Sequence, residues 1–163
     1  MQFVTFGINH NTAPISIREN IAFNADVLPA ALASLKQLPY VVEAVILSTC
    51  NRTEIYCYID DDSQLLISKW LHEFHQQAED SLLEHLYCHQ GNEAMRHLLR
   101  VACGLDSMVL GESQILGQIK TAYSDALNAE TLGKMLGRLF QHAFTVAKQV
   151  RTDTAIGDSP VSV

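Results

Sequence analysis

The stretch that most constrains the fold is the apolar, largely β-branched run from Val41 to Leu47, which leads into the polar segment 48–54, Ser-Thr-Cys-Asn-Arg-Thr-Glu. A short run of this composition predicts a buried strand. The segment that follows places one thiol on rigid backbone among hydroxyls, an amide and a guanidinium. We therefore expect Cys50 to be a nucleophile, with much of the remaining chain positioning a substrate against it. The alternative is an inert core cysteine, since free cysteine is among the most buried residue types.

The expected elements of residues 1–90 come in the order strand, helix, strand, strand, helix, strand. Strands are expected at 2–10, 41–47, 54–59 and near 86–88, and helices at about 24–38 and 65–77. This order is the ferredoxin-like βαββαβ pattern. After Gly91 the apolar residues recur at helical spacing to about residue 150. The chain is therefore predicted to be an α+β protein, with a ferredoxin-like catalytic core at 1–90, a helical part at 91–152 that completes the substrate pocket, and a linker at 153–163.

Composition is that of a soluble globular protein, since 48% of the 163 residues are apolar and 18% are charged. No apolar run approaches the roughly 20 residues of a membrane span, and the N-terminus lacks the basic segment and cleavage site of a signal peptide. We therefore expect a cytoplasmic location and no membrane contact. The formal charge of −7 argues against a general nucleic-acid coat protein.

One segment departs from this acidic balance. The helix expected up to Arg151 also carries Lys134, Arg138 and Lys148, and it has no acidic residue between 133 and 151. Such a segment either meets phosphates or is an ordinary solvated helix face, and both interpretations stay open.

The other cysteines and the histidines give a weaker signal. No two of the four cysteines form a C-x-x-C pair, which argues against a zinc knuckle, and Cys57 and Cys103 lie in apolar patterns that predict core positions. Two groups have spacings compatible with metal or haem ligands on a helix, namely His72/His75 and His85/Cys88/His89. No second cluster completes a four-ligand set. We therefore expect no metal, and haem binding stays as a minor alternative.

A second candidate site is the segment 111–114, Gly-Glu-Ser-Gln. Together with Ser107 and Gln118, it brings a carboxylate, hydroxyls and amides to one loop and helix start, through Glu112, Ser113 and Gln114. Groups of these kinds suit the ammonium and carboxylate of an amino acid. The other interpretation, favoured on sequence physics alone, is that Glu112 or Ser113 caps the helix that starts near residue 115.

His97 lies beside apolar positions of the helix expected at 92–103. A lone histidine in such a place is more often a boundary residue than a catalytic one. It becomes a candidate proton donor or acceptor only if the fold brings it near Cys50.

Taken together, these segments resemble the glutamyl-tRNA reductase family, which opens the five-carbon route to tetrapyrroles (porphyrins). Residues 7–14 with Arg18 and Glu19 resemble the opening motif of the family, 48–54 its nucleophile motif, and 104–118 its substrate-pocket motif. Three long matches in the right order make the resemblance specific, and it runs the whole chain.

The resemblance implies a mechanism. Cys50 would attack the ester that links glutamate to the 3′ end of the tRNA, and NADPH would reduce the resulting thioester to glutamate-1-semialdehyde. Thr49, Asn51 and Arg52 would line the pocket, and we assign the glutamate side-chain carboxylate to Arg52 from its charge. His97 matches a histidine important for activity. The remaining pocket positions matched are Ser107, Glu112, Ser113, Gln114 and Gln118.

Two departures matter. Ser113 stands where many members have proline, so its loop is expected to be less rigid. No G-x-G-x-x-G fingerprint is present, whereas the family carries a nicotinamide-binding domain and a dimerisation helix after this region. We therefore expect no cofactor in this chain, a linker at 153–163 to a missing NADPH-binding domain, and at most thioester formation with slow hydrolysis.

The resemblance also bears on partners. It implies glutamyl-tRNA, the downstream aminomutase and regulatory or protease-adaptor proteins as partners, and a homodimer formed through an absent C-terminal domain. Two other functions stay open. One is a regulatory module that binds a protein partner or haem, and the other is a thiol esterase unrelated to tRNA, against which the basic helix argues mildly.

Overall fold

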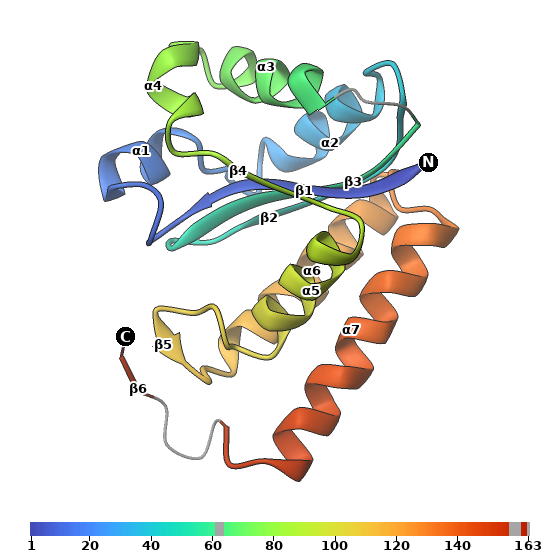
Figure 1. The fold of residues 1–163 in the computed structure, drawn as a ribbon. Helices are drawn as coiled ribbons and strands as arrows, with labels where there is room; N and C mark the ends of the chain where they lie inside the picture. The colour runs from blue at the N-terminus through green and yellow to red at the C-terminus, as the bar shows by residue number, and fades with distance from the viewer. Residues whose placement is uncertain (61–63, 157–160, 163) are drawn as a thin grey trace.

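The computed structural model describes residues 1–60, 64–156 and 161–162. It is a mixed α/β fold around a four-stranded sheet in the order β2-β3-β1-β4, in which all neighbouring strands are antiparallel (Figure 1). The strands are β1 (Gln2–Asn9), β2 (Val41–Ser48), β3 (Arg52–Ile59) and β4 (Tyr87–Gln90).

Helices cover both faces of this sheet (Figure 1). One layer contains α1 (Ile15–Asn20), α2 (Leu28–Lys36), α3 (Gln64–Phe74) and α4 (Glu79–Leu83). The other layer contains α5 (Asn92–Ala102), α6 (Gln114–Asn128) and α7 (Lys134–Asp153). Beyond the sheet, β5 (Val109–Leu110) pairs with β6 (Val161–Ser162) in a two-stranded antiparallel ladder.

The two layers make two apolar cores, because successive side chains of a strand point to opposite faces. On β3, Ile55 and Cys57 pack into the core under α2 and α3, whereas Tyr56 packs into the core against α5–α7. Because both faces of the sheet are buried, the sequences of its strands are nearly continuous apolar runs. The same alternation places Arg52 and Glu54 on the face of Tyr56, toward α5–α7, and this placement sets up the site described below.

A buried carboxylate anchors α7 to the sheet. Glu43 of β2 is 5% exposed, and its oxygens accept hydrogen bonds from the backbone N–H groups of Gly133 (2.7 Å), Leu136 (2.9 Å) and Met135 (3.1 Å). These are N–H groups that the first turn of a helix cannot satisfy by itself. A polar residue inside an apolar strand therefore caps a helix 90 positions away.

The observed elements correct several expectations. The third strand begins at Arg52, two positions before its predicted start, because Arg52 is buried and paired within the fold. Helix α1 was not predicted, the expectation that residues 91–152 are helical is wrong at β5, and β6 lies in the predicted linker. The predicted linker at 153–163 lies partly outside the described residues, and α7 itself runs to Asp153. Within the described part of the chain, no helix is long and apolar enough to cross a membrane.

Candidate active site

Cys50 lies in the short turn that joins β2 to β3, and its side chain is exposed. The backbone N–H of Thr49 donates to the carbonyl of Arg52 at 2.8 Å, which closes the turn. The hydroxyl oxygen of Thr49 accepts from the backbone N–H groups of Asn51 and Arg52, each at 3.2 Å. The sulfur is thus open to solvent while the backbone that carries it is fixed. The inert-core alternative is excluded for Cys50, and it holds for Cys57 and Cys103, which are buried.

A small cavity of about 40 Å³ opens beside this turn. It is built from the turn, from the loop after α5 and from the first two turns of α6. Its lining residues are Thr49, Cys50, Asn51, Arg52, Ser107, Met108, Glu112, Gln114, Ile115 and Gln118. The structure therefore brings together the two segments that the sequence marks out separately.

Ser113 is not among these lining residues. It is exposed at the N-cap position of α6 and makes no side-chain capping hydrogen bond. The capping interpretation of this segment therefore has no support from Ser113, while Glu112 faces the cavity.

Two glycines and one arginine shape the loop that carries Glu112. Gly104 and Gly111 both have left-handed backbone angles, with φ of 77° and 78°, and the N–H of Gly111 donates to the carbonyl of Gly104 at 3.0 Å. Arg151, near the end of α7, donates to the carbonyl of Glu112 at 2.6 Å and to that of Gly111 at 3.4 Å. The loop is therefore held at its base by the glycines and from outside by a guanidinium.

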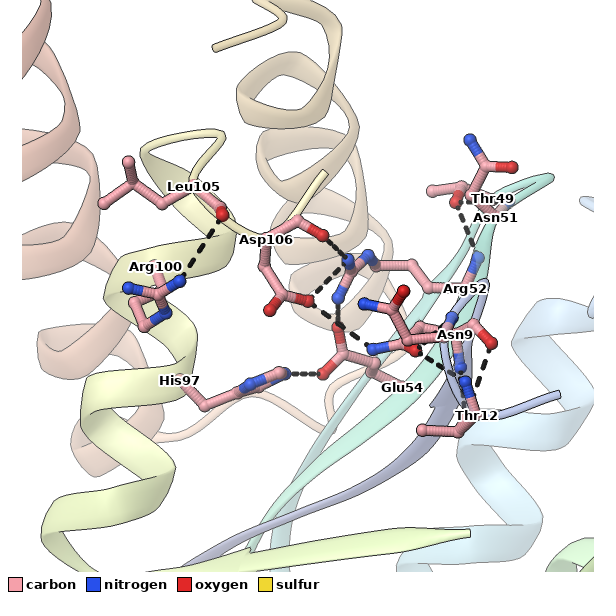
Figure 2. A network of polar contacts seen from close by, with 11 residues as sticks. Asn9, Thr12, Thr49, Asn51, Arg52, Glu54, His97, Arg100, Leu105 and Asp106 are labelled. Atoms are coloured by element: carbon pink, nitrogen blue, oxygen red, sulfur yellow. Dashed lines mark hydrogen bonds and ion pairs between the residues drawn. The ribbon is translucent and has the colours of Figure 1, made fainter. Parts of the chain in front are cut away.

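Arg52 forms the centre of a buried ionic network, which Figure 2 shows from close by. Its side chain is 2% exposed. One terminal nitrogen donates to Glu54 Oε1 at 2.6 Å, and the other donates to Asp106 Oδ2 at 2.8 Å and to the Asp106 carbonyl at 2.7 Å. Burial alone would lower the pKa of Arg52, but Glu54 and Asp106 raise it above its ordinary value. The guanidinium thus ties β3 to the loop after α5 and stays charged.

His97 connects to the same network on its far side (Figure 2). Its Nε2 donates to Glu54 Oε2 at 2.5 Å, and Glu54 is fully buried. Burial alone would raise the pKa of Glu54, but the hydrogen bond and charge of His97, together with Arg52, lower it to about 2. His97 does not line the Cys50 cavity. It lines a separate cavity of about 390 Å³ together with Asn9, Tyr87, His89 and Asp106, and it reaches the Cys50 side through Glu54 and Arg52.

Sequence reasoning missed Glu54 and Asp106 as site residues, and Met108 and Ile115 as apolar lining. Glu54 is the last residue of the polar segment around Cys50. A signal for it existed, because Arg52 and Glu54 are two positions apart on a strand and so share one face. Asp106 precedes Ser107 directly, but nothing in its local sequence points to Arg52.

The histidine and cysteine spacings do not assemble into a ligand set. His75 packs its ring against Phe23 with centroids 4.5 Å apart, His85 contacts the carbonyl of Thr12 at 2.9 Å, and His89 stacks on His97 at 4.6 Å. Among the residues that the structure describes, no group of three or more His, Cys, Asp or Glu side chains is arranged to hold a metal ion.

Comparison with known proteins places this chain in a family. The family model described as "Glutamyl-tRNAGlu reductase, N-terminal domain" matches residues 6–154. The chain belongs to this family. A glutamyl-tRNA reductase of Nitrosococcus oceani is 58% identical over 163 residues, which are 100% of this chain and 39% of that protein. For the glutamyl-tRNA reductase of Methylococcus capsulatus the identity is 55%, again over 100% of this chain and 39% of that protein.

A solved structure agrees. The glutamyl-tRNA reductase of Methanopyrus kandleri superposes with a TM-score of 0.77 at 31% sequence identity, covering 93% of this chain and 35% of that one. The chain thus spans about two fifths of the length of the curated relatives it matches. The fold and the family are therefore secure for these residues.

Proposed function

We propose that this chain performs the acyl-transfer half of the glutamyl-tRNA reductase reaction. The Cys50 thiolate attacks the carbonyl carbon of the glutamyl ester, so that a C–S bond forms and the C–O bond to the terminal ribose breaks. The ribose oxygen takes up from solvent the proton that the Cys50 thiol had lost and leaves as free tRNA, and glutamate stays on the enzyme as a thioester. The observation that carries this proposal is the exposed Cys50 on a fixed turn, sharing one cavity with Ser107, Glu112, Gln114 and Gln118.

We further propose that NADPH, bound outside these 163 residues, supplies the hydride that reduces the thioester to glutamate-1-semialdehyde. The strand order β2-β3-β1-β4, with its two helical crossovers, supports a ferredoxin-like core for residues 1–90. Residues 91–152 complete the cavity, because Ser107, Glu112, Gln114 and Gln118 come from that part.

The lining groups divide into charged and neutral roles. Glu112 is the carboxylate suited to the substrate ammonium, and the hydroxyls and amides of Thr49, Asn51, Ser107 and the two glutamines suit its oxygens. Arg52 is the cation suited to the glutamate carboxylate. It already pairs with two carboxylates, so a substrate carboxylate has to displace Asp106, whose side chain is 21% exposed, whereas that of Glu54 is fully buried.

His97 acts at a distance in this proposal. Because it bonds Glu54 and lines a different cavity, we assign it a positioning role through Glu54 and Arg52 in place of a proton transfer at the sulfur. His97→Gln, which keeps a donor at this position, is expected to retain more Cys50 acylation than His97→Ala, with unfolding measured in parallel. Equal acylation in the two variants contradicts this role.

The basic face of α6 and α7 is the candidate contact for the RNA backbone. Lys120, Lys148 and Arg151 line a groove of about 370 Å³ together with Phe144. Lysines on such a face neutralise phosphates and make binding depend on salt. Because Arg151 also holds the Glu112 loop, Lys120→Glu with Lys148→Glu tests this contact: the affinity for glutamyl-tRNA and its salt dependence both fall, and an unchanged affinity contradicts it.

Mass spectrometry of the chain after exposure to glutamyl-tRNA tests the nucleophile. A glutamyl adduct is expected on Cys50, and none is expected in Cys50→Ser. Cys88→Ser is the matched control, because Cys88 is also exposed. An adduct that persists in Cys50→Ser contradicts the proposal. Equal acylation by glutamyl-tRNA and by a small glutamyl ester favours a thiol esterase with no use for tRNA.

A further inference from the structure

A cavity much larger than the Cys50 cavity lies next to it, along one side of α6. This groove, which we call the α6 groove, has a volume of about 580 Å³. Its walls come from the segment before α2, from the end of β2 and from α6. It is lined by Phe23, Ala25, Leu28, Ile46, Leu47, Ser48, Gln114, Gly117, Gln118, Thr121, Ala122 and Asp125. Gln114 and Gln118 line both the α6 groove and the Cys50 cavity, so the two spaces adjoin.

Gly117 forms an open part of the groove. It lies inside α6, where glycine destabilises a helix relative to alanine. Neither packing nor backbone geometry requires glycine here, because an added Cβ meets no atom within 4 Å and the backbone angle is not left-handed. A helical glycine with neither reason leaves room for a ligand to approach the backbone closely. Gly117 therefore keeps the groove open along this side of α6.

The Cys50 cavity has little open space around it for the rest of the substrate. Its volume of about 40 Å³ leaves no room for a nucleoside beside the glutamyl group. The bonded pair of Arg52 and Asp106 stands between it and the His97 cavity, since Arg52 lines the first and Asp106 the second. For the part of the substrate beyond the ester, the nearest large space is therefore the α6 groove, which adjoins the Cys50 cavity at Gln118.

We propose that the α6 groove holds the terminal nucleoside of the acylated RNA, so that its ribose ester is presented to Cys50. This inference rests on the proposed function and names where the leaving group sits. Gln118, Thr121 and Asp125 follow one another at helical spacing along the groove and offer partners for ribose hydroxyls and an exocyclic amine. Phe23 and Leu28 give the apolar wall that a base requires. The Asp125 carboxylate disfavours phosphate, so the groove suits a neutral nucleoside and leaves the RNA backbone outside.

The test compares two acyl donors on the same chain. Acylation of Cys50 is followed by mass spectrometry with glutamyl-tRNA and with a small α-glutamyl alkyl thioester, which has no nucleoside. Gly117→Leu fills the groove with a side chain that favours helix, and Gly117→Ala adds one methyl group. Gly137→Ala is the matched control, because Gly137 is also helical and its added Cβ meets only the Tyr123 hydroxyl, at 4.0 Å.

We expect Gly117→Leu to lower the ratio of the two rate constants, tRNA donor over thioester, by on the order of a hundredfold, as displacement of a reacting group by about 1 Å can do. Gly117→Ala lowers the ratio less, and Gly137→Ala leaves it unchanged. Thermal unfolding by circular dichroism verifies that each variant is folded.

A ratio in Gly117→Leu equal to that of the unsubstituted chain overturns the assignment, as does an equal loss with both donors. If the ratio is unchanged but Gly117→Leu slows hydride transfer in the full-length enzyme, the groove holds the nicotinamide instead. Failure of the proposed function looks different, because the unsubstituted chain then forms no adduct on Cys50 from glutamyl-tRNA.

Discussion

Replacing Glu54 by Gln removes the charge that lies between Arg52 and His97. The carboxylate is fully buried and accepts hydrogen bonds from both side chains, at 2.6 and 2.5 Å. Breaking a buried ion pair from one side typically costs about 3–5 kcal/mol. Arg52 keeps Asp106 as a partner in the variant, so the lower end of this range applies.

The pKa of Glu54 gives an independent magnitude. His97 and Arg52 outweigh burial and lower this pKa to about 2. A shift of that size corresponds to about 3 kcal/mol of stability at neutral pH. Because the folded pKa is depressed, this contribution is fully present above the ordinary pKa of a glutamate, about 4.5, and it is lost as the pH falls toward 2. Both routes therefore predict that Glu54→Gln loses about 3 kcal/mol at pH 7.

Urea unfolding followed by far-UV circular dichroism, at a series of pH values, measures this loss. The difference between the two proteins should be greatest near neutral pH and should vanish near pH 2. Glu73→Gln is the control, because Glu73 forms an exposed pair with Lys69 at 3.8 Å, which is worth less than about 1 kcal/mol. If Glu54→Gln costs no more than Glu73→Gln at pH 7, the reasoning about the network is refuted.

Three further predictions concern other parts of the fold. Glu43→Gln should lower the free energy of unfolding by about 1–3 kcal/mol, measured in urea, because an amide accepts through one oxygen where the carboxylate caps α7 with two. Gly104→Ala should destabilise more than Gly91→Ala: both have positive φ, but only at Gly104 does the new methyl meet backbone, at 3.1 Å, and equal melting temperatures would contradict this. Iodoacetamide should alkylate Cys50 in the folded chain and spare Cys57, whose thiol pKa is raised by burial, and peptide mapping reads out the result.

The strands and long helices are predictable from the sequence because their apolar residues recur at the period of each element. Val41–Leu47 is observed as β2, which ends one residue later at Ser48. Helix α1 has no such signal, since it is six residues long, buries no side chain and lacks a side-chain cap. Arg52 falls outside the strand predicted at 54–59, and one of the partners that hold it in β3, Asp106, lies 54 positions away in the chain.

The site also has a part that is predictable from the sequence and a part that is not. The turn around Cys50 and the loop around Glu112 each carry a local signature, and the fold brings them to one cavity. Apart from the pair of Arg52 and Glu54, the network behind them has no local signature, because Arg52 and Asp106 are 54 positions apart and Glu54 and His97 are 43 apart. Such pairs depend on which helix covers which face of the sheet. Periodicity predicts that a face is covered, but it does not predict by which helix.

The turn that carries Cys50 joins two strands whose pairing runs without interruption from Ser48 and Thr53 back to Ala44 and Cys57. An extra residue inserted between positions 49 and 51 would have to be looped out or would shift β3 by one place. A shift would send Arg52 and Glu54 under α2 and turn Ile55 toward α5, exchanging the contents of the two cores. The number of residues in this turn is therefore as tightly fixed as their identity, and insertions here should be far less tolerated than at other surface hairpins.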